Sequence, residues 1–442
     1  KEKAAKKAAK KAEPEAPKKP MTYDAGPQPL ADMSGRADEK REETIKKLKA
    51  LIPTLQKNNP GKPIRMFQLA EEYWKKSRYI YIMGITKLDK AMDAWAEAGS
   101  EGNPPSFKAL PEYRESSVYK AEALKLYRKV LKQYPKFENN DRVYYAMASA
   151  HLEAGEKKKA ARRFRDLTKY FPKSDFAADS YLQLGEYFFN SGQANLSKAI
   201  GAYKRAARSK KPRIYSFALY KLAWCDYNLN EYEKALAKFK EVVAYSLKQS
   251  AAAKKKAKMS RKDQIQLIEE ALSDMVRTYS HLDAVDDAFD YYVGIKQKEK
   301  AYPYLRKLGD RYISEGKYAV GIKMYRKLNE DSDYQYNEKA PFNQANIMNA
   351  FAQLDRKNDV RKEARRMIAL YSPNTMWAEK NAGNQRVLDN AFEVVEQKLG
   401  ELVTEKHKEA QETKLVSTYE LARDLYKDYL EKFPSSEDAY QF

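Results

Sequence analysis

Residues 141–172 read DRVYYAMASAHLEAGEKKKAARRFRDLTKYFP, and this stretch decides the fold. Apolar and small residues recur at steps of three and four on both sides of Gly155, which is the pattern of two amphipathic helices. Gly155 suits the left-handed conformation that ends a helix, and Pro172 cannot continue the second helix. The stretch therefore predicts a helix–turn–helix unit.

The same unit returns along the chain at intervals of about 34 residues. A second copy runs from Ala178 to Pro212, and a third contains Leu229 to Ala235 at its turn. Weaker copies follow around 275–288, 308–325 and 348–373, and half-copies lie near Tyr127 and Tyr426. Repeated helix pairs bury their apolar faces against their neighbours, so chain length sets the number of units. We expect an all-α solenoid of roughly seven to eight helix pairs, with atypical long helices near both ends.

The first unit resembles a tetratricopeptide repeat (TPR) at its signature positions. Counted from Asp141, positions 8 and 20 hold Ala148 and Ala160, where the two helices must cross closely. The other signature positions 4, 7, 11, 15, 24, 27 and 32 hold Tyr144, Met147, His151, Gly155, Phe164, Leu167 and Pro172. The resemblance implies a right-handed α-solenoid that binds other proteins along the concave face of its first helices.

Two closing segments resemble a narrower group of TPR proteins. KYFPKSD at 169–175 and EKFPSSED at 431–438 share an aromatic-Pro-x-Ser step into the next helix, as in TPR proteins of the bacterial cell envelope. Within that group, the long Lys-rich chain is similar to TPR lipoproteins of gliding-motility machinery. The resemblance implies a periplasmic protein, with outer-membrane anchoring through an N-terminus that the sequence lacks, because the chain begins with Lys1 and breaks off in an unfinished repeat.

The repeat pattern and its interruptions divide the chain into six parts. Lys/Ala-rich and Pro-rich segments predict a disordered tether at the start, and the region around Trp377 predicts long helices, either a projecting pair or a divergent repeat. The predicted parts are a tether at 1–40, a helical cap and loop at 41–111, TPR repeats at 112–247, a basic mobile loop at 248–262, divergent TPR repeats at 263–373, and long helices with a truncated terminal TPR at 374–442.

The resemblance also indicates which side chains point into the concave groove, namely positions 2, 5, 9 and 12 of each first helix. The third unit places aromatic rings at all four positions, which suits an extended peptide or a helix as the bound partner. Alternatively, some of these rings pack against neighbouring helices. The expected groove residues are Arg142, Tyr145, Asp179, Glu186, Phe189, Phe217, Tyr220, Trp224, Tyr227 and Arg277.

The chain carries 84 basic and 62 acidic side chains, a net charge of +22, which favours anionic partners. Part of the excess lies between two repeats, where a run of cations is either a solvated loop or a patch for an anionic surface. Anionic lipid, a cell-wall polymer and acidic proteins fit such a patch; nucleic acid is less expected, because no base-reading motif accompanies the charge. The patch residues are Lys254, Lys255, Lys256, Lys258, Arg261 and Lys262.

The sequence offers no recognisable reaction chemistry. Cys225 is the single cysteine and lies within an apolar helix, which favours packing over reactivity. His151, His281 and His407 fall in different units, and no pair has the spacing of metal ligands. Because no phosphate-binding glycine loop or nucleophile motif occurs, we expect no enzyme activity, no catalytic residue, no metal and no cofactor.

These observations favour a non-enzymatic interaction scaffold of a bacterial envelope assembly. The expected partners are proteins of a multi-subunit envelope complex, held in the concave groove, with gliding motility and outer-membrane or cell-wall coordination as candidate settings. The alternative is a cytoplasmic basic TPR protein that binds nucleic acid or an anionic surface. No apolar run of about 18 residues is present that would span a membrane.

Overall fold

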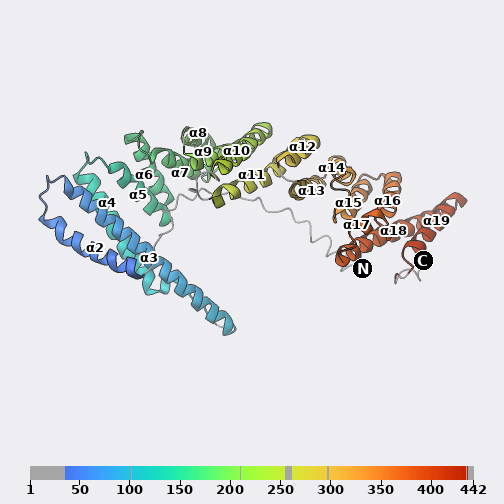
Figure 1. Cartoon of the computed structure of the whole chain (residues 1–442), viewed down its shortest axis with the longest axis horizontal. Coiled ribbons are helices and arrows are strands. Elements are labelled where there is room, and N and C mark those ends of the chain that lie inside the picture. Colours follow the sequence, from blue (N-terminus) through green and yellow to red (C-terminus); the bar gives the residue numbers. More distant parts are fainter. Residues whose placement is uncertain are drawn as a thin grey trace. The chain divides into compact units, whose positions relative to one another are not determined.

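The computed structural model of the chain describes residues 35–100, 102–209, 211–253, 261–295, 298–434 and 436. Within these ranges every regular element is helical, and consecutive helices lie antiparallel in pairs (Figure 1). The expected all-α solenoid of helix pairs is therefore confirmed.

The chain divides into two compact units. The N-terminal unit contains the described residues of 20–228 and 245–253, and the C-terminal unit contains 229–244 and the described residues from 261 onward. The N-terminal unit comprises α2 (Gly35–Thr54), α3 (Gly61–Glu97), η1 (Phe107–Ala109), α4 (Pro111–Gln133), α5 (Asn140–Glu153), α6 (Lys157–Tyr170), α7 (Ala177–Phe189), η2 (Gln193–Asn195), α8 (Leu196–Ala206) and α9 (Pro212–Asn228).

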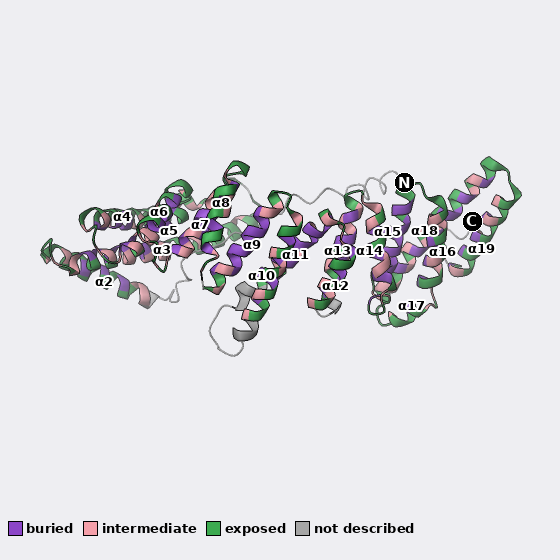
Figure 2. Ribbon diagram, turned by 90° about the horizontal axis from the view of Figure 1, so that it is seen from above, coloured by how far each residue is buried: buried purple, intermediate pink, exposed green. Residues whose placement is uncertain are grey.

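Helix α10 (Tyr232–Ala253) contributes residues to both units. The remaining elements of the C-terminal unit are α11 (Arg261–Leu282), α12 (Val285–Ile295), α13 (Lys298–Ser314), α14 (Tyr318–Glu330), α15 (Ala340–Gln353), α16 (Lys357–Tyr371), α17 (Met376–Lys380), α18 (Gln385–Thr413) and α19 (Val416–Lys432). Residues that face neighbouring helices, in the same pair or the next, are buried, and those that face solvent are exposed (Figure 2).

Two predicted boundaries differ from the structure. Helix α2 begins at Gly35, so the end of the predicted tether 1–40 is helical, while residues 1–34 lie outside the described residues. The predicted loop 248–262 is also shortened, because α10 continues to Ala253 and α11 starts at Arg261. Residues 254–260, between those two helices, lie outside the described residues.

Within a helix pair, a ring from the second helix lies directly on a small residue of the first. A Cβ atom at Gly309 of α13 would lie 2.8 Å from Cε1 of Tyr325 in α14, and one at Gly185 of α7 would overlap the ring of Tyr203 in α8. Both tyrosines are completely buried. Glycine at these two positions therefore sets how closely the helices cross.

The same tyrosine also donates a hydrogen bond to the carboxylate that follows the small residue. Among the described residues, four helix pairs share this Tyr–carboxylate clasp: two of the carboxylates follow glycines, and the other two follow Ala70 and Val395. The bonds are Tyr127 Oη to Glu71, Tyr203 Oη to Glu186 Oε1 at 2.6 Å, Tyr325 Oη to Asp310 Oδ1 at 2.6 Å, and Tyr429 Oη to Glu396 Oε1 at 2.9 Å. A bond to a charged acceptor stabilises the pair more than a neutral one, and it satisfies a buried hydroxyl.

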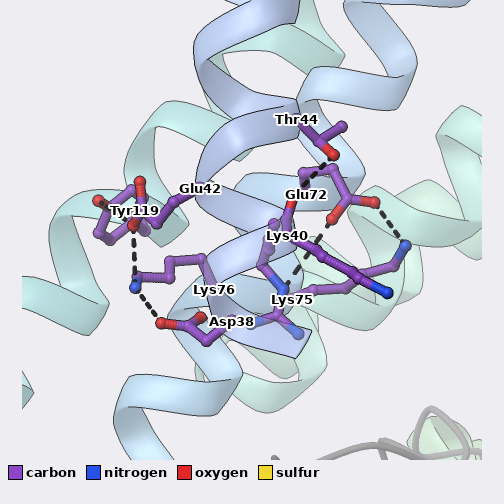
Figure 3. Close-up of polar contacts among 9 residues, drawn as sticks. Asp38, Lys40, Glu42, Thr44, Glu72, Lys75, Lys76 and Tyr119 are labelled. Atoms are coloured by element: carbon purple, nitrogen blue, oxygen red, sulfur yellow. Dashed lines mark hydrogen bonds and ion pairs between the residues drawn. The ribbon is translucent and has the colours of Figure 1, made fainter. Parts of the chain in front are cut away.

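Helix α2 is fixed to α3 by a network of charges (Figure 3). Lys76 Nζ of α3 lies 2.5 Å from Asp38 Oδ2 and 2.9 Å from Glu42 Oε1, and Arg41 Nη1 lies 2.5 Å from Asp38 Oδ1. Burial lowers the pKa of Lys76, but the hydrogen bonds to the two carboxylates outweigh it and raise the pKa above its ordinary value. Ile45 of α2 is buried in the same contact, so the first helix of the cap packs like part of the array.

Ion pairs join successive second helices in the C-terminal unit. They connect α10 to α12, α12 to α14, and α14 to α16, so each outer helix is bonded to the next. We call this set the ion-pair ladder: Lys240–Asp287 at 2.9 Å, Lys323–Asp286 at 2.6 Å, Lys327–Asp286 at 2.8 Å, Arg326–Glu363, and Arg366–Glu330 at 2.9 Å. In α4, α6 and α8 of the N-terminal unit, no ion pair between described residues joins one second helix to the next; the pairs are local, apart from that between Lys87 of α3 and Glu112 of α4.

The close crossing predicts opposite effects of two glycine substitutions. Gly185→Ala destabilises the protein by about 1–3 kcal/mol, because the new methyl group overlaps the Tyr203 ring. Gly201→Ala in α8 stabilises it by about 0.5–1 kcal/mol, because its Cβ meets open space and alanine favours the helix. Thermal unfolding followed by circular dichroism measures both, and equal shifts would contradict the crossing.

The clasp in the first pair predicts a pH dependence. Burial raises the pKa of Glu71 above its ordinary 4.5, against the hydrogen bond from Tyr127. The folded state thus holds this proton more tightly, and the associated stability is complete below pH 4.5 and is lost as the pH rises through the raised pKa. Glu71→Gln keeps an acceptor for Tyr127 without the buried charge, so we expect a higher melting temperature at pH 7 and no difference below pH 4.5. Glu115→Gln, an exposed carboxyl on α4, is the matched control.

Candidate binding surface

Helix α7 carries three of the predicted groove residues, Asp179, Glu186 and Phe189. It begins with Asp179 in its first turn and ends at Phe189, and between them its side chains are mostly buried. Glu186 is 7% exposed and Gln183 is 5% exposed. A helix that buries polar side chains in this way must provide partners for them.

Glu186 lies at the centre of a buried polar cluster. Its Oε1 accepts a hydrogen bond from Tyr203 Oη at 2.6 Å and lies 3.0 Å from the ammonium of Lys221 in α9. The Lys221 ammonium also lies 4.7 Å from the ring centroid of Phe189, a cation–π distance. Burial, followed by the charge of Glu186, raises the pKa of Tyr203, so this phenol remains a donor. We call Glu186, Tyr203 and Lys221 the α7–α9 cluster.

Several buried polar atoms of α7 have no hydrogen-bond partner among the described residues, including Ser180 Oγ, Gln183 Nε2 and Glu186 Oε2. A buried polar atom without a partner costs about 1–3 kcal/mol. Because these atoms are shielded from solvent, they are a cost of the helix packing and not contacts open to a bound molecule.

Tyr145 and Asp179, both predicted groove residues, are brought together by the structure. Tyr145 Oη of α5 donates to Asp179 Oδ2 of α7 at 2.8 Å, and the Tyr145 ring lies 4.7 Å from that of Phe176. This bond joins the first helices of neighbouring pairs. Both side chains are half-buried, so the contact leaves part of each exposed.

The aromatic residues predicted for the third groove unit are mostly interior. Phe217, Tyr220 and Trp224 are 4%, 0% and 6% exposed, and only Tyr227 is half-buried. Phe217 and Tyr220 lie 5.8 Å apart between ring centroids, and Trp224 and Tyr227 lie 5.3 Å apart. The first three rings therefore act as packing residues in this structure.

The remaining predicted site residues lie elsewhere. Arg142 of α5 is exposed, whereas Arg277 of α11 is half-buried and belongs to the C-terminal unit. Of the predicted basic patch, Lys254, Lys255, Lys256 and Lys258 lie outside the described residues. Arg261 and Lys262 form the start of α11, and the placement of their side chains is likewise not described.

The metal-binding side chains of the described residues lie apart from one another. Its His, Cys, Asp and Glu side chains form no cluster of three that could hold a metal ion. Cys225 is buried, and His151 is 2.6 Å from Glu156 Oε2, with a pKa that burial lowers. Among the same residues, no helix combines the length and the apolar run needed to cross a membrane.

Sequence reasoning missed two residues of this surface, Lys221 and Gln183. Lys221 is the one Lys or Arg within the otherwise apolar run from Ile214 to Cys225, and such an isolated charge in an all-round apolar helix indicates a buried ion pair. Gln183 falls outside the groove positions that the repeat pattern defines, so nothing in the sequence distinguished it.

The α7–α9 cluster predicts a strong coupling between two substitutions. Lys221→Met leaves the Glu186 carboxylate buried beside an apolar side chain, and we expect a loss of about 3–5 kcal/mol in unfolding free energy. Adding Glu186→Gln removes the unpaired charge and recovers most of that loss. Denaturant unfolding of the two single variants and the double variant measures the coupling, and additive effects would refute it.

Comparison with known proteins supports the helix-pair assignment. The tetratricopeptide-repeat family model matches residues 121–183, and a second tetratricopeptide-repeat model matches 217–246. The C-terminal part of a TPR repeat-containing protein from Cytophaga hutchinsonii is 18% identical, over 64% of this chain and 95% of that one, with a TM-score of 0.32. A human IFIT1 dimer with PPP-AAAA is 11% identical, over 91% and 86%, with a TM-score of 0.24. The search of curated proteins gave no match. From the two family matches and the paired helices, the chain is a tetratricopeptide-repeat protein.

Proposed function

We propose that the protein is a non-enzymatic scaffold that binds an extended stretch of a partner protein along α5, α7 and α9. Tetratricopeptide repeats point in general to protein–protein interaction. The observation that carries the proposal is the bonded pair Tyr145 and Asp179, which joins α5 to α7 and leaves part of each side chain exposed. The backbone N–H and C=O groups of an extended segment can bond the exposed part of this carboxylate and phenol.

Flanking residues supply the apolar and charged contacts for such a segment. Phe189 and Tyr227 are half-buried and offer rings, and Arg142 is exposed and offers a cation. Rings and arginine are the side chains that contribute most to binding at protein interfaces. Together they favour a polypeptide over a small molecule, because the described cavities lie away from these residues.

The proposed setting is an assembly of the bacterial envelope, in the periplasm and anchored to the outer membrane. Its support is the aromatic-Pro-x-Ser step, whose serine has a defined contact: Ser174 Oγ donates to Asp141 Oδ2 at 2.6 Å, and Phe176 N donates to Ser174 Oγ at 3.1 Å. The serine thus ties the turn back to the first helix of its own pair. Gliding motility and cell-wall coordination are the settings to examine first.

Partner binding predicts a loss of capture in a groove variant. With the full chain as bait in the organism's own extract, we expect Asp179→Ala combined with Phe189→Ala to lose its cross-linked partner proteins at least tenfold, since two interface contacts contribute about 1 kcal/mol or more each. Lys362→Ala, an exposed residue on α16, is the control. Circular dichroism confirms that each variant is folded, and unchanged capture by the groove variant would refute this binding face.

The envelope setting makes a separate prediction. Fractionation of the native cells should place the full-length protein with periplasmic and outer-membrane markers, and recovery with cytoplasmic markers would exclude that setting. The outcome is independent of the groove variants, so the binding face and the location are tested apart.

A further inference from the structure

We propose that the outer faces of α4, α6 and α8 form a docking surface for a bilayer that contains anionic phospholipid. This surface is distinct from the proposed groove, which lies on the first helices. Its residues also differ from the basic run at 254–262, because they belong to described helices of the N-terminal unit.

Helix α6 carries the densest positive charge. Its 14 residues, KKKAARRFRDLTKY, include seven basic side chains and one acidic side chain. The side facing the neighbouring helices buries Ala160, Phe164 and Leu167. The opposite side exposes four cations at helical spacing, namely Lys158, Arg162, Arg165 and Lys169.

The flanking second helices continue this stripe. Helix α4 exposes Arg128, Lys129 and Lys132, and α8 exposes Lys204 and, just beyond its end, Arg208. In Figure 2, α4, α6 and α8 follow one another along one edge of the N-terminal unit, with exposed outward sides. We take the exposed cations of these three helices together as the proposed basic face.

Most of these cations have no acidic partner. Among the described residues, Arg128, Lys132, Arg162, Arg165 and Lys204 form no ion pair, and no pair joins one of these three helices to another. The second helices of the C-terminal unit differ, because the ion-pair ladder neutralises many of their charges. Like charges on neighbouring helices repel each other, and an anionic surface removes that cost.

The spread of charge over this face, and the side chains at its edges, favour a lipid bilayer as the bound partner. A bilayer attracts delocalised basic charge without requiring a particular register. Val118, 62% exposed, lies on the same side of α4 as Lys125 and Arg128, and Tyr170, 57% exposed, ends α6. An apolar and an aromatic side chain at the edges of a basic face suit the headgroup boundary.

The same features disfavour nucleic acid. Single strands bind to platforms of several exposed rings, whereas the described residues of α4, α6 and α8 expose only two, Tyr113 and Tyr170, on different helices.

The test compares two variants of the full chain with equal charge change. The surface variant is Lys158→Gln, Arg162→Gln and Arg165→Gln on α6. The control is Lys307→Gln, Lys362→Gln and Arg365→Gln, three exposed residues of the C-terminal unit. Both variants lose three positive charges, so a general electrostatic effect is the same in each.

Co-sedimentation with vesicles of phosphatidylglycerol and phosphatidylcholine in equal parts measures affinity at about 0.1 M salt. We expect the surface variant to bind about a hundredfold more weakly than the unmodified chain, because each basic residue near an anionic bilayer contributes roughly fivefold. The control should stay within a few-fold of the unmodified chain, and vesicles of phosphatidylcholine alone should bind none of the three.

Three results would overturn the proposal. They are equal losses in the two variants, no binding of the unmodified chain to the anionic vesicles, and binding of a short DNA duplex that depends on the α6 residues while vesicle binding does not. Circular dichroism of both variants verifies the fold. The groove variants of α7 leave vesicle binding unchanged, so failure here is distinguishable from failure of the proposed function.

Discussion

The close crossing of the two helices in each pair is the constraint on which the rest of the structure depends. At Gly185 and Gly309 the backbone of the first helix carries no side chain, and a tyrosine ring from the second helix occupies that space. A larger residue would push the helices apart. The ring would then become exposed, and the next pair, which packs on the same two helices, would lose part of the surface that it packs against.

The candidate binding surface follows from the same crossing. Because the ring lies over the small residue, its hydroxyl reaches the carboxylate one position later, as Tyr203 reaches Glu186 and Tyr325 reaches Asp310. In the α7–α8 pair this carboxylate also meets Lys221 from the following first helix. A packing requirement thus places a buried charge on the face where partners are expected to bind, and it fixes that charge in position.

Much of the fold could be predicted from the sequence, because its determinants are local. Gly155 and Pro172 end the two helices, and Ala148, Ala160 and Phe164 lie where the helices cross. The periodicity of such residues was enough to predict the helix pairs. The clasps could not be predicted from the sequence. It does not show whether the carboxylate of an acidic residue accepts a hydrogen bond from a tyrosine hydroxyl or from water. The docking of α2 was missed for a similar reason, as Lys76 and Asp38 are far apart in sequence.

The candidate site was predicted less well, for two physical reasons. Position within a repeat does not reveal burial, so the sequence left open whether Phe217, Tyr220 and Trp224 line a groove or pack against neighbouring helices, and they lie in the interior. The anion-binding patch was predicted from an uninterrupted basic run in the sequence, and this criterion selected 254–262. On α6 the cations alternate with core residues such as Phe164, and only the helical arrangement gathers Arg162 and Arg165 on one side.

The ion-pair ladder has a consequence for how the repeats unfold. In an array whose stability is a sum of unit and interface contributions, pairs such as Arg366–Glu330 belong entirely to the interface. An outer helix of the C-terminal unit therefore loses favourable electrostatics when its neighbour opens, which makes these repeats open together. When a neighbour opens in the N-terminal unit, the outer helices lose no ion pair between them, and the electrostatic change is a relief of repulsion. Their repeats therefore open more independently. One chain thus combines a cooperative block with a stretch that can open locally, and the division follows the placement of its acidic residues.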